Sequence, residues 1–155
     1  MDVSGFIAGA AHVLAAAIWL GAMAYSLVVV QPRSRRFLGD DERSEGFAAT
    51  LASGARYPVL ALIAVLAISG GALAALGGDE GRPDGWWALV AIKGVALAIA
   101  LAVFAWVSWR LWPARIFAAR EELPAIRRRF AFAALTLTGL VITGTVLGVA
   151  ARWLS

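Results

Sequence analysis

The stretch GFIAGAAHVLAAAIWLGAMAYSLVVV, residues 5–30, decides the fold because it holds one histidine and no Asp, Glu, Lys or Arg. A helix of this length, rising about 1.5 Å per residue, crosses a hydrocarbon core of about 30 Å. No basic segment precedes the apolar run, so we interpret it as a retained membrane span rather than a signal peptide. His12 is the only histidine in the chain, and its place in a membrane span marks it as a candidate functional residue.

Three more apolar segments follow, at about residues 57–76, 86–109 and 130–154. Of the 155 residues, 61% are hydrophobic and 15% are charged, whereas a soluble domain carries about 25% charged residues. Because lipid offers no partners for open backbone groups, each segment is predicted to be helical. The sequence therefore predicts an all-α fold, an integral membrane four-helix bundle that forms one transmembrane domain over residues 1–155. No internal repeat stands out, although each half is a helical hairpin.

Basic residues are concentrated in the two connections at residues 31–56 and 110–129. These connections hold eleven of the 14 Lys and Arg residues: Arg33, Arg35, Arg36, Arg43, Arg56, Arg110, Arg115, Arg120, Arg127, Arg128 and Arg129. The positive-inside rule places such loops in the cytoplasm, and both termini are therefore expected on the outer side. Tryptophans gather at both ends of the spans, as an aromatic belt would: Trp86, Trp87 and Trp153 outside, and Trp106, Trp109 and Trp112 inside.

A polar layer is predicted near the outer ends of the four spans. His12 and Lys93 each lie seven residues inside their spans, which places both about 10 Å below the outer helix ends. Trp19 shares the helical stripe of His12. We predict an outward-facing pocket with His12 as the metal or haem ligand, lined by Trp19, Ser69, Lys93 and Thr145.

Structural interpretations of the same residues stay open. Lys93 has a long stem that can carry its ammonium to the headgroups, and a neutral His12 can hydrogen-bond between helices. The glycines in the spans are interpreted as packing positions: Gly5, Gly9, Gly70, Gly144 and Gly148.

Several function classes find no support in the sequence. Every carboxylate falls in a loop or a tail, so the membrane spans offer no acid–base pair for catalysis or proton coupling. There is no cysteine for a disulfide or a thiolate metal site. The net charge of +4 is explained by the cytoplasmic loops, which also suit anionic lipid headgroups, and needs no nucleic acid. We expect a membrane protein in contact with the lipid bilayer, and these observations favour a non-enzymatic role without deciding it.

Four stretches of the chain together resemble the four-helix core of the copper-resistance D (CopD) family: "HVLAAAIWLGAMAY", "RYPVLALIAVLAISGGALA", "WWALVAIKGVALAIALAVFAW" and "RRRFAFAALTLTGLVITGTVLG". They contain H-x6-W-x-G in the first span, Arg56 before the second, Lys93 in the third and a basic start to the fourth. The resemblance implies a multi-pass protein of the bacterial inner membrane that takes part in copper uptake, transfer or tolerance. It also implies a periplasmic copper-binding protein as partner.

The chain is also similar, more distantly, to the HemJ-type protoporphyrinogen oxidase family. That family is four-helical and has a similar histidine, a tryptophan seven residues later and a lysine in a later helix, which correspond here to His12, Trp19 and Lys93. This resemblance implies haem b, with His12 as axial ligand. The stretch "LGAMAYSLVVVQPRSRR" after Trp19 departs from the HemJ pattern, because it lacks an aromatic-rich Leu-Pro-Arg stretch and further histidines.

Copper and haem iron differ in the number of protein ligands that they require. Cu(I) prefers two or three soft or imidazole ligands, and Met23, on the stripe of His12, lies about 16 Å along the helix. Copper therefore requires a second copy of the chain in a homo-oligomer, a partner protein, or a relay through one ligand. Haem iron needs only one axial imidazole, and Lys93 suits a propionate. A structural accessory subunit of a larger membrane complex, with no ligand of its own, is a third alternative.

Overall fold

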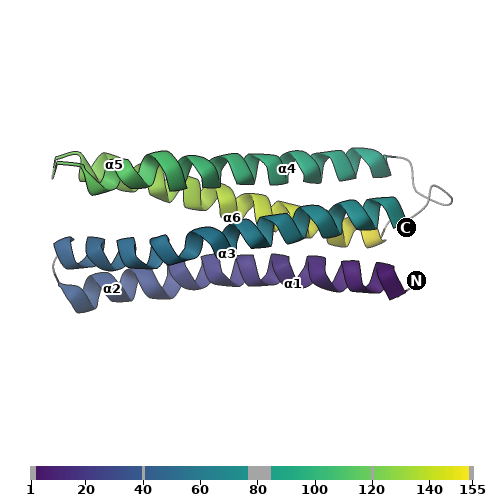
Figure 1. Cartoon of the computed structure of the whole chain (residues 1–155), viewed down its shortest axis with the longest axis horizontal. Coiled ribbons are helices and arrows are strands. Elements are labelled where there is room, and N and C mark those ends of the chain that lie inside the picture. Colours follow the sequence, from purple (N-terminus) through teal and green to yellow (C-terminus); the bar gives the residue numbers. More distant parts are fainter. Residues whose placement is uncertain (1–2, 40, 77–84, 120, 154–155) are drawn as a thin grey trace. The chain divides into compact units, whose positions relative to one another are not determined.

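The computed structural model describes residues 3–39, 41–76, 85–119 and 121–153, and almost all of these residues are helical. The chain divides into two compact units, Met1–Leu73 and Ala74–Ser155. Each unit is built on a helical hairpin, visible as ribbons in Figure 1. For the described residues, the prediction of an all-α protein with four long apolar helices is confirmed.

The first unit is a hairpin of two long helical runs. Its outgoing run is α1 (Val3–Tyr25), a π-helical segment η1 (Ser26–Val30) and α2 (Gln31–Leu38), and α3 (Asp41–Leu76) forms the return (Figure 1). Gly39 follows α2 with a φ of 59°, a left-handed conformation that glycine adopts without steric cost and that commonly ends helices.

The two runs of this hairpin meet along small and apolar residues. On α1 the buried residues are Gly5, Ala15 and Trp19, and on α3 they are Ile63, Leu66 and Ser69. Ala15 and Trp19 are four residues apart, and Ile63, Leu66 and Ser69 follow one another at intervals of three, spacings that place each group on one face of its helix. Each helix therefore carries one narrow buried face.

The second unit repeats this arrangement. Its outgoing run is α4 (Trp86–Trp106), the π-helical segment η2 (Val107–Leu111) and the short α5 (Trp112–Ile116). The return is α6 (Leu123–Trp153), which packs against α4. At the turn, the Glu122 carboxylate accepts a hydrogen bond of 3.1 Å from the Ala119 backbone N–H, and this bond ties the connection to the start of α6.

Two prolines that follow the predicted spans 5–30 and 86–109 lie inside continuous helical runs. Pro32 and Pro113 each follow a π-helical segment by two residues. The residue before Pro32, Gln31, donates its N–H to the Ser26 carbonyl five residues back. The wider π turn absorbs the clash between the proline ring and the preceding turn that would otherwise break an α-helix. Both runs therefore continue past their proline.

Much of each predicted connection, at residues 31–56 and 110–129, is helical. The first is occupied by α2 and the start of α3, and the second by the end of η2, by α5 and by the start of α6. Pro58, the second residue of the predicted segment 57–76, consequently lies inside α3. The physical reason is that a helix does not have to end at the membrane surface, and the Arg, Ala, Glu and Leu residues there favour helix.

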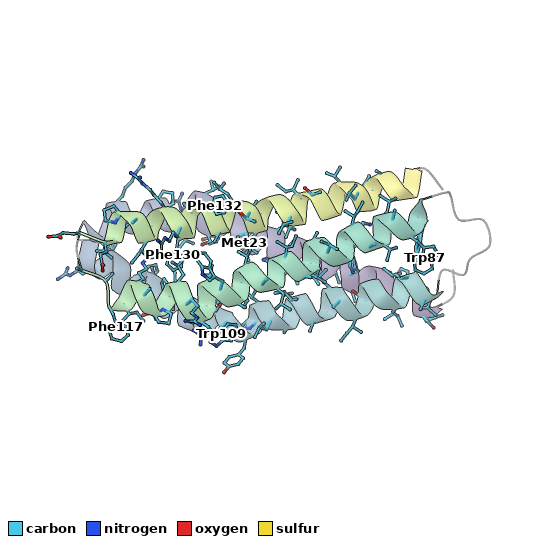
Figure 2. All side chains as sticks on the ribbon, turned by 90° about the horizontal axis from the view of Figure 1, so that it is seen from above. Met23, Trp87, Trp109, Phe117, Phe130 and Phe132 are labelled. Carbon is cyan, nitrogen blue, oxygen red and sulfur yellow. The ribbon has the colours of Figure 1, made fainter. Side chains whose placement is uncertain are left out.

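Four described helices are long and apolar enough to cross a membrane: Val3–Leu38, Gly54–Leu76, Trp86–Ile116 and Leu123–Ala150. Large apolar side chains along them are widely exposed, including Val28, Ile68 and Phe132, and Phe132 is labelled in Figure 2. Burial of apolar surface away from water is worth about 25 cal/mol per Å², so these faces are costly in water and suited to lipid. The structure thus fits a multi-pass membrane protein.

Trp112 differs from its predicted place in the inner aromatic belt. It is only 8% exposed and packs edge-to-face on Phe130 of α6, with ring centroids 5.2 Å apart. The Arg115 guanidinium lies over both rings, 5.1 Å from Trp112 and 4.9 Å from Phe130. The indole therefore closes the hairpin instead of facing the lipid interface.

This packing predicts a local stability effect. Trp112→Ala should lower the free energy of unfolding in a denaturing-detergent titration by about 1–2 kcal/mol, through the loss of aromatic and cation–π contacts. Trp109→Ala is the matched control, because Trp109 is 50% exposed and should change stability little. Equal effects of the two substitutions would contradict the closing role of Trp112.

Candidate functional site

His12 and Ser69 lie together inside the first unit, on α1 and α3. Nδ1 of His12 is 2.9 Å from Oγ of Ser69, a hydrogen bond between residues that are 57 positions apart in the chain. His12 is half-buried and Ser69 is 5% exposed. The structure therefore brings together two of the residues that the depth count placed in one layer.

The proton positions in this pair follow from the other contacts of the serine. Oγ of Ser69 lies 2.5 Å from the Val65 carbonyl oxygen and 3.4 Å from that of Leu66. A carbonyl only accepts, so the single hydroxyl proton of Ser69 is committed to its own helix, with Val65 as the closer acceptor. Ser69 must then accept from His12, and Nδ1 of His12 carries a proton.

This assignment determines which ring nitrogen can bind a metal. When Nδ1 of a neutral imidazole is protonated, the basic lone pair is on Nε2. Histidines that ligate metals usually donate their other ring N–H to an oxygen acceptor, which fixes the tautomer and the ring orientation. The hydrogen bond from His12 to Ser69 is an arrangement of this kind, with Nε2 as the ligating atom.

Gly70 sets the position of the imidazole ring. A Cβ added at Gly70 would lie 3.3 Å from Cε1 and 3.7 Å from Nδ1 of His12. The missing side chain therefore gives the ring its place against α3, next to the serine that accepts the hydrogen bond from Nδ1. Gly70 was predicted to be a packing position alone, and its contact with His12 gives it a more specific role.

Trp19 lies two helical turns along α1 from His12, and it is the most completely buried of the core side chains at 2% exposed. Ala15, between them, is also buried. The stretch of α1 that follows His12 thus has a buried face, which includes Trp19 of the predicted stripe. That Trp19 also forms the floor of a ligand site stays a prediction.

Lys93 and Thr145 belong to the second unit. Nζ of Lys93 lies 3.4 Å from where a Cβ at Gly148 of α6 would be, and the ammonium therefore rests against the glycine surface of that helix. Thr145 is exposed, and its hydroxyl donates to the Val141 carbonyl at 2.8 Å. The convergence of His12, Ser69 and Lys93 with Trp19 and Thr145 in one pocket stays a prediction.

Sequence reasoning missed two features of these sites. Gly70 and Gly148 lie beside the only histidine and the only lysine, and the available signal was that each glycine falls at the same depth as its partner. The sequence could not indicate the Val65 carbonyl as the acceptor of the Ser69 hydroxyl, because every residue has a backbone carbonyl. Only the rotamer of Ser69 determines that the hydroxyl donates to Val65.

The chemistry of this site is that of a single imidazole. Among the residues that the structure describes, no group of three or more His, Cys, Asp or Glu side chains is arranged to hold a metal ion. The donor at hand is one nitrogen, Nε2 of His12. One imidazole can be the axial ligand of haem iron, or one of the two or three ligands of Cu(I) when a second molecule supplies the rest.

The chain matches no family model, no curated protein and no solved structure in the comparisons. The class that the fold defines is therefore a helical protein with four spans suited to a membrane.

Proposed function

We propose that this protein handles copper in a bacterial inner membrane, with Nε2 of His12 as the ligand through which the ion passes. The observation that carries the proposal is the hydrogen bond from Nδ1 of His12 to Ser69, which assigns the lone pair to Nε2. The resemblance of the four spans to the CopD family supports copper as the ion. The positive-inside rule supports an outward, periplasmic exposure of the site.

The proposed chemistry is ligand exchange without redox change. A periplasmic copper-binding protein or a second copy of the chain supplies the other donors while Cu(I) is held by His12. One neutral imidazole binds Cu(I) more weakly than a site of two or three ligands does, so the ion is able to leave for the next site. Weak binding in isolation and binding in the presence of a donor protein are therefore both expected.

Haem b is the second candidate, and the single imidazole favours it. The chain has one histidine and no cysteine, which is enough for one axial ligand to iron but not for a complete copper site. His12 fits this role because its Nδ1–H is held by Ser69, an arrangement that also orients axial histidines. Bound haem would supply one-electron redox chemistry.

One preparation separates the two candidates. Protein purified in a neutral detergent from cells supplied with copper and haem precursors is examined by absorption spectroscopy and by metal analysis, beside His12→Ala. Copper that co-purifies or binds on addition of Cu(I), and is lost in His12→Ala, supports the proposal. A Soret band lost in His12→Ala supports haem instead. A preparation that is colourless and binds no Cu(I), with or without a copper-donor protein, contradicts both.

Ser69→Ala tests the supporting hydrogen bond. Removal of an outer partner of a ligating histidine typically weakens metal affinity about 10- to 100-fold, and we expect a loss in this range for Cu(I). Thr138→Ala is the control, because it also removes a hydroxyl that donates to its own helix, here to the Ala134 carbonyl at 2.8 Å, but on α6. Competition with a colorimetric Cu(I) chelator measures both, and equal affinities for the two variants would contradict the role of Ser69.

A further inference from the structure

The two hairpins follow one plan in their outgoing helices. An offset of 81 residues relates the first residues of the two π-helical segments, Ser26 and Val107, and it also relates Pro32 to Pro113. The same offset relates Trp19 to Ala100, both of which are buried. The two outgoing runs therefore share a π-helical segment of five residues and a proline two residues after it. They also share a buried position at the same offset.

At this offset the counterpart of His12 is Lys93. His12 is the only histidine and Lys93 the only lysine of the chain, since the other basic residues are all arginine. Each side chain also meets a glycine on the returning helix of its own hairpin, His12 at Gly70 and Lys93 at Gly148. The sequence alone conceals this correspondence, because the identical pairs at this offset are mostly alanine.

The charge of Lys93 is not matched by any acidic residue of the spans. None of the four candidate spans contains Asp or Glu, and an ionised side chain within a membrane span usually pairs with another group. A group that carries negatively charged oxygen would satisfy the ammonium through charge-assisted hydrogen bonds. Gly148 of α6 lets Nζ approach this helix closely, because a Cβ at Gly148 would lie 3.4 Å from Nζ and a larger side chain would crowd it.

We propose that the second hairpin repeats the plan of the first, and that Lys93 with Gly148 is its counterpart of the pair His12 and Gly70, forming a site for a phosphate or carboxylate group. An anion at Lys93 requires no contact of His12 with copper, so this proposal does not depend on the proposed copper ligand. The anionic group belongs either to a molecule dissolved in the membrane or to a soluble anion.

The ligand is tested by NMR on a single signal. In protein labelled with ¹³C at lysine Cε, Lys93 gives the only lysine resonance. In neutral detergent, dodecyl phosphate, dodecanoate and inorganic phosphate are titrated separately, with dodecanol as the neutral probe. We expect a saturable shift with an anion and none with dodecanol. Saturation by inorganic phosphate identifies a soluble ligand, and saturation only by the amphiphiles identifies a membrane-borne one. No saturable shift with any anion, or an equal shift with dodecanol, overturns the site.

Gly148→Leu tests the role of the glycine, and we expect at least tenfold weaker binding. The matched control is Gly144→Leu, one helical turn earlier, where an added Cβ meets nothing within 4 Å. Equal binding by the two variants would remove Gly148 from the site. If either variant fails to fold, the titration of the unaltered protein still tests whether Lys93 binds an anion.

The shared plan has its own test, in which the first pair is rebuilt in the second hairpin. The variant carries His12→Ala, Lys93→His and Leu147→Ser, because Leu147 precedes Gly148 as Ser69 precedes Gly70. The ¹⁵N spectrum of its single histidine is expected to show protonated Nδ1 and unprotonated Nε2. The opposite tautomer, or a spectrum unaffected by omission of Leu147→Ser, would contradict the correspondence.

Discussion

His12→Ala is expected to abolish binding of Cu(I) to the purified protein. The substitution removes the only imidazole of the chain, and no cysteine is present to replace it. Loss of an outer partner alone costs about 10- to 100-fold in metal affinity, so loss of the ligand itself should exceed about 100-fold. The measurement is competition with a Cu(I) chelator, in the presence and absence of a periplasmic copper donor.

The control for this substitution is Met23→Ala. Met23 lies on the same helical stripe and carries a thioether that Cu(I) accepts, but it is about 16 Å further along the helix. We expect Met23→Ala to bind as the unaltered protein does. If Met23→Ala lost copper and His12→Ala kept it, the ligand would be the thioether and the proposal for Nε2 would be wrong.

Gly70→Leu is expected to have the second largest effect. The first side-chain carbon alone would lie 3.3 Å from Cε1 of His12, closer than carbon atoms ordinarily approach, and the remaining leucine atoms require the ring to move. The imidazole would then leave Ser69, so that the hydrogen bond and the orientation of Nε2 are lost together. We expect a loss of Cu(I) affinity of about 100-fold, at the upper end of the effects of outer partners.

Gly71→Leu provides the comparison. Gly71 is the next residue of α3, and a Cβ there would meet nothing within 4 Å. Both substitutions add the same apolar side chain to the same turn of one helix, so their effects on helix propensity and lipid exposure are similar. Copper affinities that fall equally in both variants would show that the loss does not come through contact with His12.

The positions of the four apolar spans could be predicted from the sequence because the absence of charge over some twenty residues is a strong constraint in lipid. The ends of the helices could not be predicted from the sequence. Pro32 and Pro113 normally break helices, and only the backbone shows that a π turn before each of them absorbs the clash. A π turn shifts the backbone hydrogen bonds by only one residue, and this shift could not be recognised in the hydrophobic pattern of the sequence.

The candidate site was predicted in part. Counting residues from the span ends placed His12 and Ser69 at one depth, and the structure joins them by a hydrogen bond. Depth does not give rotation about the helix axis, and for this reason Gly70 was assigned to packing while it contacts the ring. The tautomer of His12 depends on the Ser69 rotamer, which the sequence does not encode in any simple pattern.

Ser69 accepts a hydrogen bond from the protonated Nδ1 of His12, and this bond leaves Nε2 as the ligating atom. Because the chain has one histidine, ¹⁵N-histidine labelling gives one pair of ring signals, recorded without metal in mildly alkaline buffer. We predict a protonated Nδ1 and an unprotonated Nε2, with the preference lost in Ser69→Ala. A ring protonated at Nε2, with Nδ1 as the bare nitrogen, would contradict the account.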